Sequence, residues 1–238
     1  MAMGAPMGMI MADWQAALYT LQTWFSPSFP IGAYTYSHGL ENVVERGKIT
    51  NVEEAMDWLR DMVMRGNGYA DAVFLCAAYD AVLAKDGDAL AQVSEYAVAF
   101  CGTAELRLES QSQGAACMEA IQKVTPNGGI DHLVQCWPGP YPYALVIGAA
   151  AAALELDRQA VTTAFLHGFV SNLASALVRL VPLGQSDGQR LIAELAPLVL
   201  QTTGRALTTP WQEVSTATLM VDIASMAHET QYTRLFRS

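Results

Sequence analysis

The chain has 238 residues, enough for one large domain to fold around its own core without disulfide or metal support. Apolar residues make up 52% of it and charged residues only 15%, so either the core is large or part of the surface is apolar and made for partners. The formal net charge is −10 and no basic stripe with interleaved aromatic residues is visible, which argues against nucleic-acid binding.

The N-terminal residues 1–12 alternate Met with Gly and Ala and show no periodicity. This composition predicts a disordered, Met-rich tail. From Asp13, which we expect to be a helix N-cap, apolar residues follow the helical period. Pro27 disfavours the helical conformation of the residue before it, so the first helix should end at Ser26.

Capping residues and apolar spacing in the middle of the chain predict four helices. Thr50 and Glu53 form a capping-box pattern, and a clear apolar stripe continues from them. Residues 71–84 are apolar almost all round, which is typical of a central helix with neighbours on every side. Apolar residues at helical spacing predict two more helices, over residues 90–100 and 106–124.

The second half continues in the same way. Residues 143–154 are Ala-rich and favour a helix, residues 158–180 predict a long one, residues 187–200 another, and residues 211–228 a weaker one rich in Thr and Ser. The period of two that marks strands appears nowhere at useful length. The sequence therefore predicts an all-α, single-domain helical bundle of about ten helices over residues 13–238.

The sequence favours a cytoplasmic protein. The longest uncharged stretch, residues 137–154, is interrupted by three prolines and is too short to span a bilayer. No Lys or Arg precedes Arg46, so the basic start of a signal peptide is missing. The cysteines are widely spaced and without a C-x-x-C pair, which indicates reduced and mostly buried thiols. They are Cys76, Cys101, Cys117 and Cys136.

No catalytic or metal-binding signature stands out. The four histidines are far apart in sequence and form no H-x-x-x-H pattern, and neither a Walker-type phosphate loop nor a G-x-S-x-G elbow is present. We therefore expect no enzyme, no catalytic residues, no metal ligands and no stably bound cofactor. Direct metal binding by His38, His132 and His228 is a weaker alternative.

Two segments with Pro and Gly interrupt the helices. Residues 26–41 hold two prolines and two glycines around Tyr34 and Tyr36. They are either a tight connection with its aromatic residues turned inward or a rigid loop that offers tyrosine hydroxyls to a partner. Residues 179–192 break at Pro and Gly, and Ser186 or Asp187 should cap the next helix. The favoured interpretation of this segment is an ordinary break between two helices.

The C-terminal segment, residues 228–238, is unusual for a chain end because it carries aromatic and Arg side chains in an acidic protein. Such residues suggest a tail that orders against something. Docking onto its own domain would satisfy this, as would docking onto a partner. The side chains concerned include Tyr232, Arg234, Leu235 and Phe236.

Three segments also carry specific motifs. Residues 26–41 follow S-P-x-x-P-x-G-x-x-x-Y-S-x-G-L-E, residues 179–189 follow R-L-V-P-L-G-Q-x-x-G-Q, and residues 228–238 follow H-E-x-Q-Y-x-R-L-F-R-S. In this order and separation they resemble the signature regions of the UreF family of urease accessory proteins. The likeness covers residues 16–238 and departs at Ala33, where the family usually has a second glycine.

The resemblance implies an all-α protein that dimerises and binds the accessory protein UreD, also called UreH. The pair would recruit the GTPase UreG, and nickel would pass as cargo into apo-urease. It also implies a C-terminal tail, from about residue 228, that orders on binding UreD. A role in regulating GTP hydrolysis would fall to Arg234. The partner-binding residues that the resemblance implies are Tyr34, Tyr36, Tyr232, Arg234, Leu235 and Phe236.

An alternative from a different class of function rests on polar residues within the helix of residues 106–124. Arg107, Glu109, Ser110 and Gln113 could form a buried polar patch, as in a small-molecule-binding protein or a hydrolase without a recognisable motif. A buried cluster facing an enclosed pocket, with a strongly shifted carboxylate, would favour this alternative over a solvated helix face.

Overall fold

The computed structural model describes the backbone of residues 7–237 and the side chains of residues 14–237. Within this range the chain forms eleven α-helices and two short 3-10 helices, and no strand. The prediction of an all-α, single-domain bundle of about ten helices is confirmed. The helices are α1 (Met7–Trp24), η1 (Ala33–Thr35), α2 (Leu40–Glu45), α3 (Val52–Arg65), α4 (Asn67–Ala84), α5 (Gly87–Phe100), α6 (Ala104–Val124), α7 (Gly128–Cys136), α8 (Tyr143–Ala153), α9 (Arg158–Leu180), α10 (Gln185–Ala206), η2 (Trp211–Glu213) and α11 (Leu219–His228).

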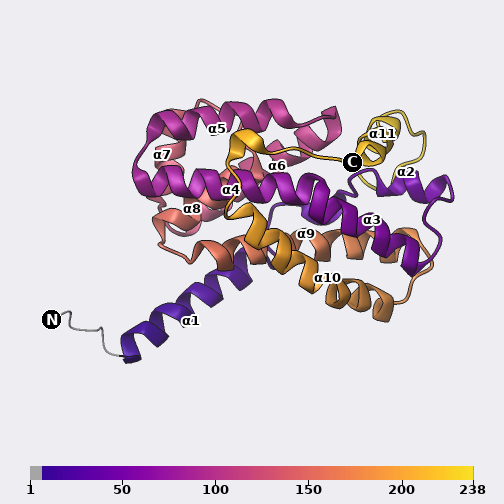
Figure 1. The fold of residues 1–238 in the computed structure, drawn as a ribbon, viewed down its shortest axis with the longest axis horizontal. Coiled ribbons are helices and arrows are strands. Elements are labelled where there is room, and N and C mark those ends of the chain that lie inside the picture. The colour runs from indigo at the N-terminus through magenta and orange to yellow at the C-terminus, as the bar shows by residue number, and fades with distance from the viewer. Residues whose placement is uncertain (1–6, 238) are drawn as a thin grey trace.

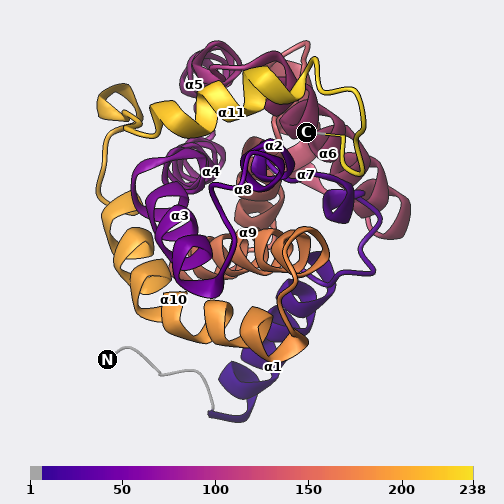
Figure 2. The ribbon, with the colours of Figure 1, turned by 90° about the vertical axis from the view of Figure 1, so that its right-hand side faces the viewer.

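Helices α4 and α8 form the centre of the bundle. Figure 2 looks along them and shows α3, α5, α6, α9, α10 and α11 around them, while α1 projects from the body (Figures 1 and 2). Nine of the eleven residues of α8 are buried, and α4 is buried along most of its length. The two helices approach closely at Gly148, where an added Cβ would lie 2.3 Å from the carbonyl oxygen of Leu75. Small residues on α8 therefore set the width of the core.

Helix α9 is the one described helix that is long and apolar enough, by length and composition, to cross a membrane. It is a different segment from residues 137–154, the longest uncharged stretch of the sequence. Half of the most apolar window of α9 is buried within the protein, and α3, α4 and α10 pack against it. We assign α9 to the core of the bundle, where an apolar helix is expected.

Several helix boundaries differ from the predicted ones. Helix α1 begins at Met7, so Asp13 is not its N-cap and residues 7–12 are helical rather than disordered. Residues 1–6 of the predicted tail lie outside the described part. Helix α3 is capped one residue later than predicted, because the Asn51 side chain accepts a hydrogen bond from the Glu54 N–H at 3.0 Å.

Two helices were not predicted, and one predicted helix is shorter. The short α2 and α7 lie in segments where too few turns exist for a periodic pattern to show. The predicted helix over residues 211–228 is a 3-10 turn followed by α11 alone. Its Thr- and Ser-rich beginning stays outside the helix, as the hydrogen-bonding tendency of these side chains favours.

Candidate functional site

The loop before α2, α2 itself, α11 and the C-terminal tail lie together at one end of the molecule (Figures 1 and 2). Helix α2 packs against α11. Gly39 allows this contact, because its φ is 78° and a Cβ there would lie 2.7 Å from the backbone nitrogen of Ser225. Ser225 in turn shares a 2.8 Å hydrogen bond with Thr103, just before α6. The tail is thus built on three helices from distant parts of the chain.

A buried polar network lies beneath the tail. His228, fully buried at the end of α11, places Nδ1 2.8 Å from Glu105 and Nε2 3.2 Å from Glu41. Arg234 donates to the other oxygen of Glu105 at 3.0 Å. Carboxylates removed from water need such partners, since an uncompensated buried charge is strongly destabilising. The network therefore joins α2, α6, α11 and the tail.

The tail backbone is fixed by the same network. Glu41 accepts hydrogen bonds from the N–H groups of Leu235 at 2.6 Å and of Phe236 at 2.9 Å. The ring of Phe236 is 3% exposed and lies 4.4 Å from the guanidinium carbon of Arg179, within cation–π range. Arg179 also donates to the carbonyl oxygen of Tyr34 at 2.7 Å. One arginine of α9 thus holds both the tail and the first loop.

The six predicted partner-binding residues divide into two groups. Tyr34 is 62% exposed, Leu235 is 66% exposed and Tyr232 is fully exposed, while Arg234 is partly exposed beside Glu105. We call these four residues the tail platform. The other two, Tyr36 and Phe236, are buried, so the expectation that their side chains face a partner needs correction. Phe236 packs against Arg179 below the exposed side chains of the tail.

The tail lies on its own domain, which is one of the two alternatives that the sequence left open. In the single chain it is held there by the bonds of Leu235 and Phe236 to Glu41. No local pattern connects Glu41 or Glu105 to the tail, because Glu41 lies 187 or more residues and Glu105 lies 123 or more residues before their partners in it. Only the motif glutamate at the end of residues 26–41 hinted at a role.

The second motif segment is mostly an ordinary helix break, as its first interpretation held. Gly184 is the N-cap of α10, and the Asp187 side chain accepts the Gly184 N–H at 3.0 Å. The predicted cap at Ser186 or Asp187 is therefore wrong by two or three positions. Of the residues in this segment, Arg179 is the one that contacts the tail.

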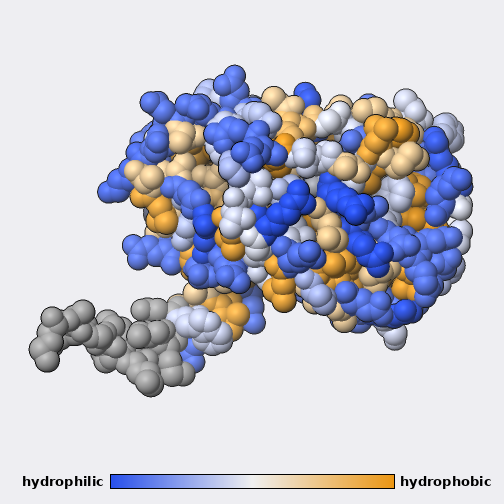
Figure 3. Space-filling model, viewed as in Figure 1, coloured by the Kyte–Doolittle hydropathy of each residue, from blue (hydrophilic) through white to orange (hydrophobic). Residues whose placement is uncertain are grey.

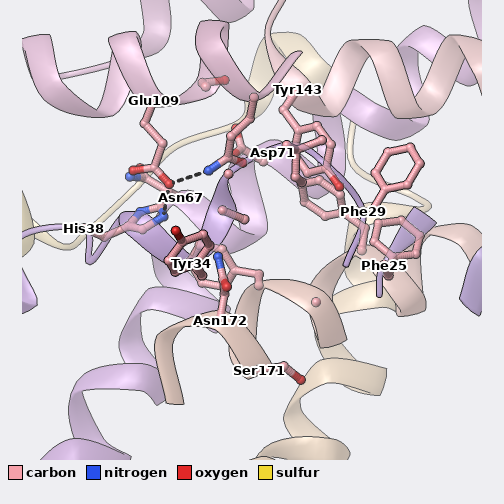
Figure 4. Close-up of a pocket in the computed structure, with 18 of the residues that line it drawn as sticks. Phe25, Phe29, Tyr34, His38, Asn67, Asp71, Glu109, Tyr143, Ser171 and Asn172 are labelled. Carbon is pink, nitrogen blue, oxygen red and sulfur yellow. Dashed lines mark hydrogen bonds and ion pairs between the residues drawn. The ribbon is translucent and has the colours of Figure 1, made fainter. Parts of the chain in front are cut away.

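A pocket of about 510 Å³ lies beside this end of the bundle, between the loop after α1 and helices α4, α5, α6, α8 and α9. Figure 4 shows His38, Asp71 and Glu109 on one side of it and aromatic rings on the other. His38 Nε2 lies 2.9 Å from Glu109 Oε1, and Gln113 donates to the same oxygen at 2.8 Å. Phe29 and Tyr34 of the first loop also line the pocket, so part of this loop's aromatic side chains face inward.

The pKa values in this pocket are perturbed. Burial alone would lower the pKa of His38, but the charge and hydrogen bond of Glu109, with the charge of Asp71, raise it above its ordinary value. Burial raises the pKa of Asp71 to about 7, with Glu109 adding to the rise and His38 opposing it. The backbone of His38 has a φ of 53°, a region that non-glycine residues seldom occupy.

The pocket meets part of the criterion set for the small-molecule alternative. Glu109 and Gln113 are buried, Ser110 lines the pocket, and one carboxylate has a strongly raised pKa. Arg107 does not belong to the cluster, because it is exposed and donates to the carbonyl of Cys101 at 3.0 Å. Asp71 was not predicted as a site residue, although it is one of two aspartates in the mostly apolar helix α4.

Direct nickel binding by the histidines gains no support. His38 is paired with Glu109, His132 lies next to Cys136 on α7, and His228 is enclosed by two carboxylates. Across the described residues, no group of three or more His, Cys, Asp or Glu side chains is placed to hold a metal ion. The four cysteines are free thiols, two of them buried.

Comparison with known proteins decides the family. The family model described as UreF matches residues 49–196. A urease accessory protein UreF of Rhodopseudomonas palustris (strain BisB5) is 44% identical over 227 residues, which is 95% of this chain and 93% of that protein. The chain belongs to the UreF family. Proteins of the same name from Azorhizobium caulinodans and Bradyrhizobium diazoefficiens are 44% and 43% identical, over 92% and 94% of this chain and 94% and 92% of theirs.

The resemblance drawn from the three motifs is therefore confirmed. UreF is a family of urease accessory proteins and not of enzymes, so the absence of a catalytic signature in the sequence agrees with the family. As a member of UreF, this chain works with other components of urease maturation. The tail platform is the part of its surface that the motifs and the geometry both single out.

Proposed function

We propose that this chain is a scaffold of nickel delivery that binds a UreD/UreH-type accessory protein and the GTPase UreG, and through them apo-urease. The observation that carries the proposal is the outward presentation of Tyr232 and Leu235 on a tail whose backbone is held from below by Glu41. Aromatic residues dominate interface energies, and a surface ordered before binding loses less entropy when a partner docks.

Helix α11 extends the apolar surface that leads into the tail. Figure 3 shows an apolar patch over this helix, at the upper right. Its exposed residues recur at helical spacing on the side away from the core: Leu219, Met220, Ile223 and Met226. A contiguous apolar face of this kind favours contact with another protein. It accounts in part for the low share of charged residues in the chain.

Arg234 suits a role at the UreG contact. Its guanidinium uses one nitrogen for Glu105, and the side chain is 41% exposed, so further donors face outward. In this proposal Arg234 binds the GTPase and influences GTP hydrolysis. Nickel is the cargo of the assembled complex and is not held by this chain alone.

The proposal also includes a homodimer in the cytoplasm. Helix α1 projects from the body, and Trp14 and Tyr19 on it are exposed (Figure 1). Large apolar side chains on a projecting helix favour burial against a second chain. We place self-association there and the other partners at the tail platform.

Co-purification with a tagged UreD/UreH-type protein tests the docking proposal. The double variant Tyr232→Ala, Leu235→Ala should lose at least tenfold in affinity, since interface aromatic residues commonly contribute 2 kcal/mol or more. Val124→Ala is the matched control, an equally exposed apolar residue about 30 Å away at the other end of α6. Equal binding by both variants would refute the placement of the partner at the tail platform.

A further inference from the structure

The pocket beside the tail platform has a construction that partner docking does not explain. It is a cavity of about 510 Å³ rather than a face, and its volume falls within the range of small-molecule sites. Its walls come from six separate parts of the chain, the loop after α1 and helices α4, α5, α6, α8 and α9. Figure 4 shows polar side chains gathered on one side and aromatic rings on the other.

The polar side is acidic and incompletely paired. Glu109 is bonded to His38 and to Gln113. The carboxylate of Asp71, also in the wall, makes no hydrogen bond with any described residue. His38 Nδ1 is likewise buried without a hydrogen-bond partner among the described residues. Asp71 is only partly buried, so its carboxylate is open to a ligand in the pocket, and carboxylates with a perturbed pKa in a cleft commonly mark functional sites.

The opposite side is built from aromatic rings. Phe25 packs edge-on against Phe165 with centroids 6.4 Å apart, and Tyr143 lies 5.5 Å from the same ring. Phe29 and Phe169 also line the cavity. Aromatic faces attract cations with an apolar body, most strongly where water is excluded.

A bare metal ion does not fit this arrangement. Across the described residues, no three His, Cys, Asp or Glu side chains are placed so that they could hold a metal ion, and the cavity is far larger than an ion needs. An anion would meet Asp71 and Glu109. A cation with an apolar body satisfies both sides at once.

We propose that the pocket binds a small organic cation, a protonated amine on an aromatic or aliphatic body, with its ammonium group beside Asp71 and its body among the rings of Phe25, Phe29 and Phe165. The ammonium donates the hydrogen bonds that the Asp71 carboxylate lacks. The site shares Tyr34 with the tail platform but binds a different kind of ligand, so it goes beyond the docking function.

Binding of the cation in this pocket is then coupled to the loss of a proton from Asp71. The pKa of Asp71 is about 7 in the empty pocket, so a cation binds the ionised form and expels the proton below that pH. The other titratable groups facing Asp71 are His38, Glu109 and Cys101. Burial raises the pKa of the Cys101 thiol to about 12, so it stays neutral. Affinity should therefore rise about tenfold from pH 6 to pH 8.

Titration calorimetry of the full chain with 2-phenylethylamine, and with the neutral 2-phenylethanol, tests the proposal. The amine should bind at least tenfold more tightly than the alcohol at pH 8. Asp71→Asn should reduce amine binding at least tenfold and weaken its pH dependence, leaving only the part that His38 contributes. Asp57→Asn, at an exposed carboxylate of α3, should change neither.

Two results would overturn the proposal. One is equal affinity for amine and alcohol in the unaltered chain, a comparison that does not depend on how any variant folds. The other is undiminished, pH-dependent amine binding by Asp71→Asn. Because the titration uses the chain alone, its failure would leave the docking proposal untouched, and failed co-purification would leave the pocket untouched.

Discussion

Replacing Glu41 by Gln should release the tail from the domain. In the native chain the two carboxylate oxygens accept one N–H each from Leu235 and Phe236, and one of them also lies 3.2 Å from His228. Glutamine keeps one acceptor oxygen and places an NH₂ group where the second was, so at least one backbone bond is lost. Hydrogen bonds to charged groups contribute about 1.5–3 kcal/mol, and we take about 2 kcal/mol for the loss.

Native-state hydrogen exchange measures this loss directly. A local opening made easier by about 2 kcal/mol should speed exchange of the Leu235 and Phe236 amides by about 30-fold. Glu45→Gln is the matched control, because Glu45 is exposed on the same helix α2, and it should leave these rates unchanged. If the Leu235 and Phe236 amides of Glu41→Gln exchange within twofold of their native rates, Glu41 is not the residue that fixes the tail.

Three further predictions concern the core, the pocket and a helix cap. Gly148→Ala should destabilise the fold by several kcal/mol in urea unfolding, since its Cβ would lie 2.3 Å from the Leu75 carbonyl, whereas Gly204→Ala in open space should stabilise α10 by about 0.5–1 kcal/mol. Because the pKa of Asp71 rises from 3.8 to about 7 on folding, this group binds more protons in the folded chain between these values, and its contribution to stability should fall as pH rises from about 4 to 7. Asp71→Asn should reduce that fall by up to about 4 kcal/mol. Asn51→Ala should cost about 1 kcal/mol in the same assay through loss of the α3 cap.

The helices could be predicted because their signals are local. Residues 158–180 gave the bounds of α9, since an apolar period over many turns is unambiguous. Helix α7 was missed because its nine residues begin with two glycines. The Asn127 side chain, which accepts from Gly129 and Ile130, supplies the start that propensity does not.

The site could be predicted only in part, because it depends on contacts between distant residues. The motifs pointed to the right end of the chain, and Tyr232 and Leu235 are exposed there. Burial of Phe236 depends on Arg179 and Glu41, which no local pattern connects to it. The pocket likewise arises from helices that meet only in the folded state.

The central claim is that this chain acts by being covered by other proteins. Co-expression with a UreD/UreH-type protein and UreG, followed by size-exclusion chromatography with light scattering, tests it most directly. We predict a single species containing all three proteins, which the Tyr232→Ala, Leu235→Ala variant fails to form and Val124→Ala still forms. Elution of this chain by itself, apart from a complex of the other two, would contradict the account.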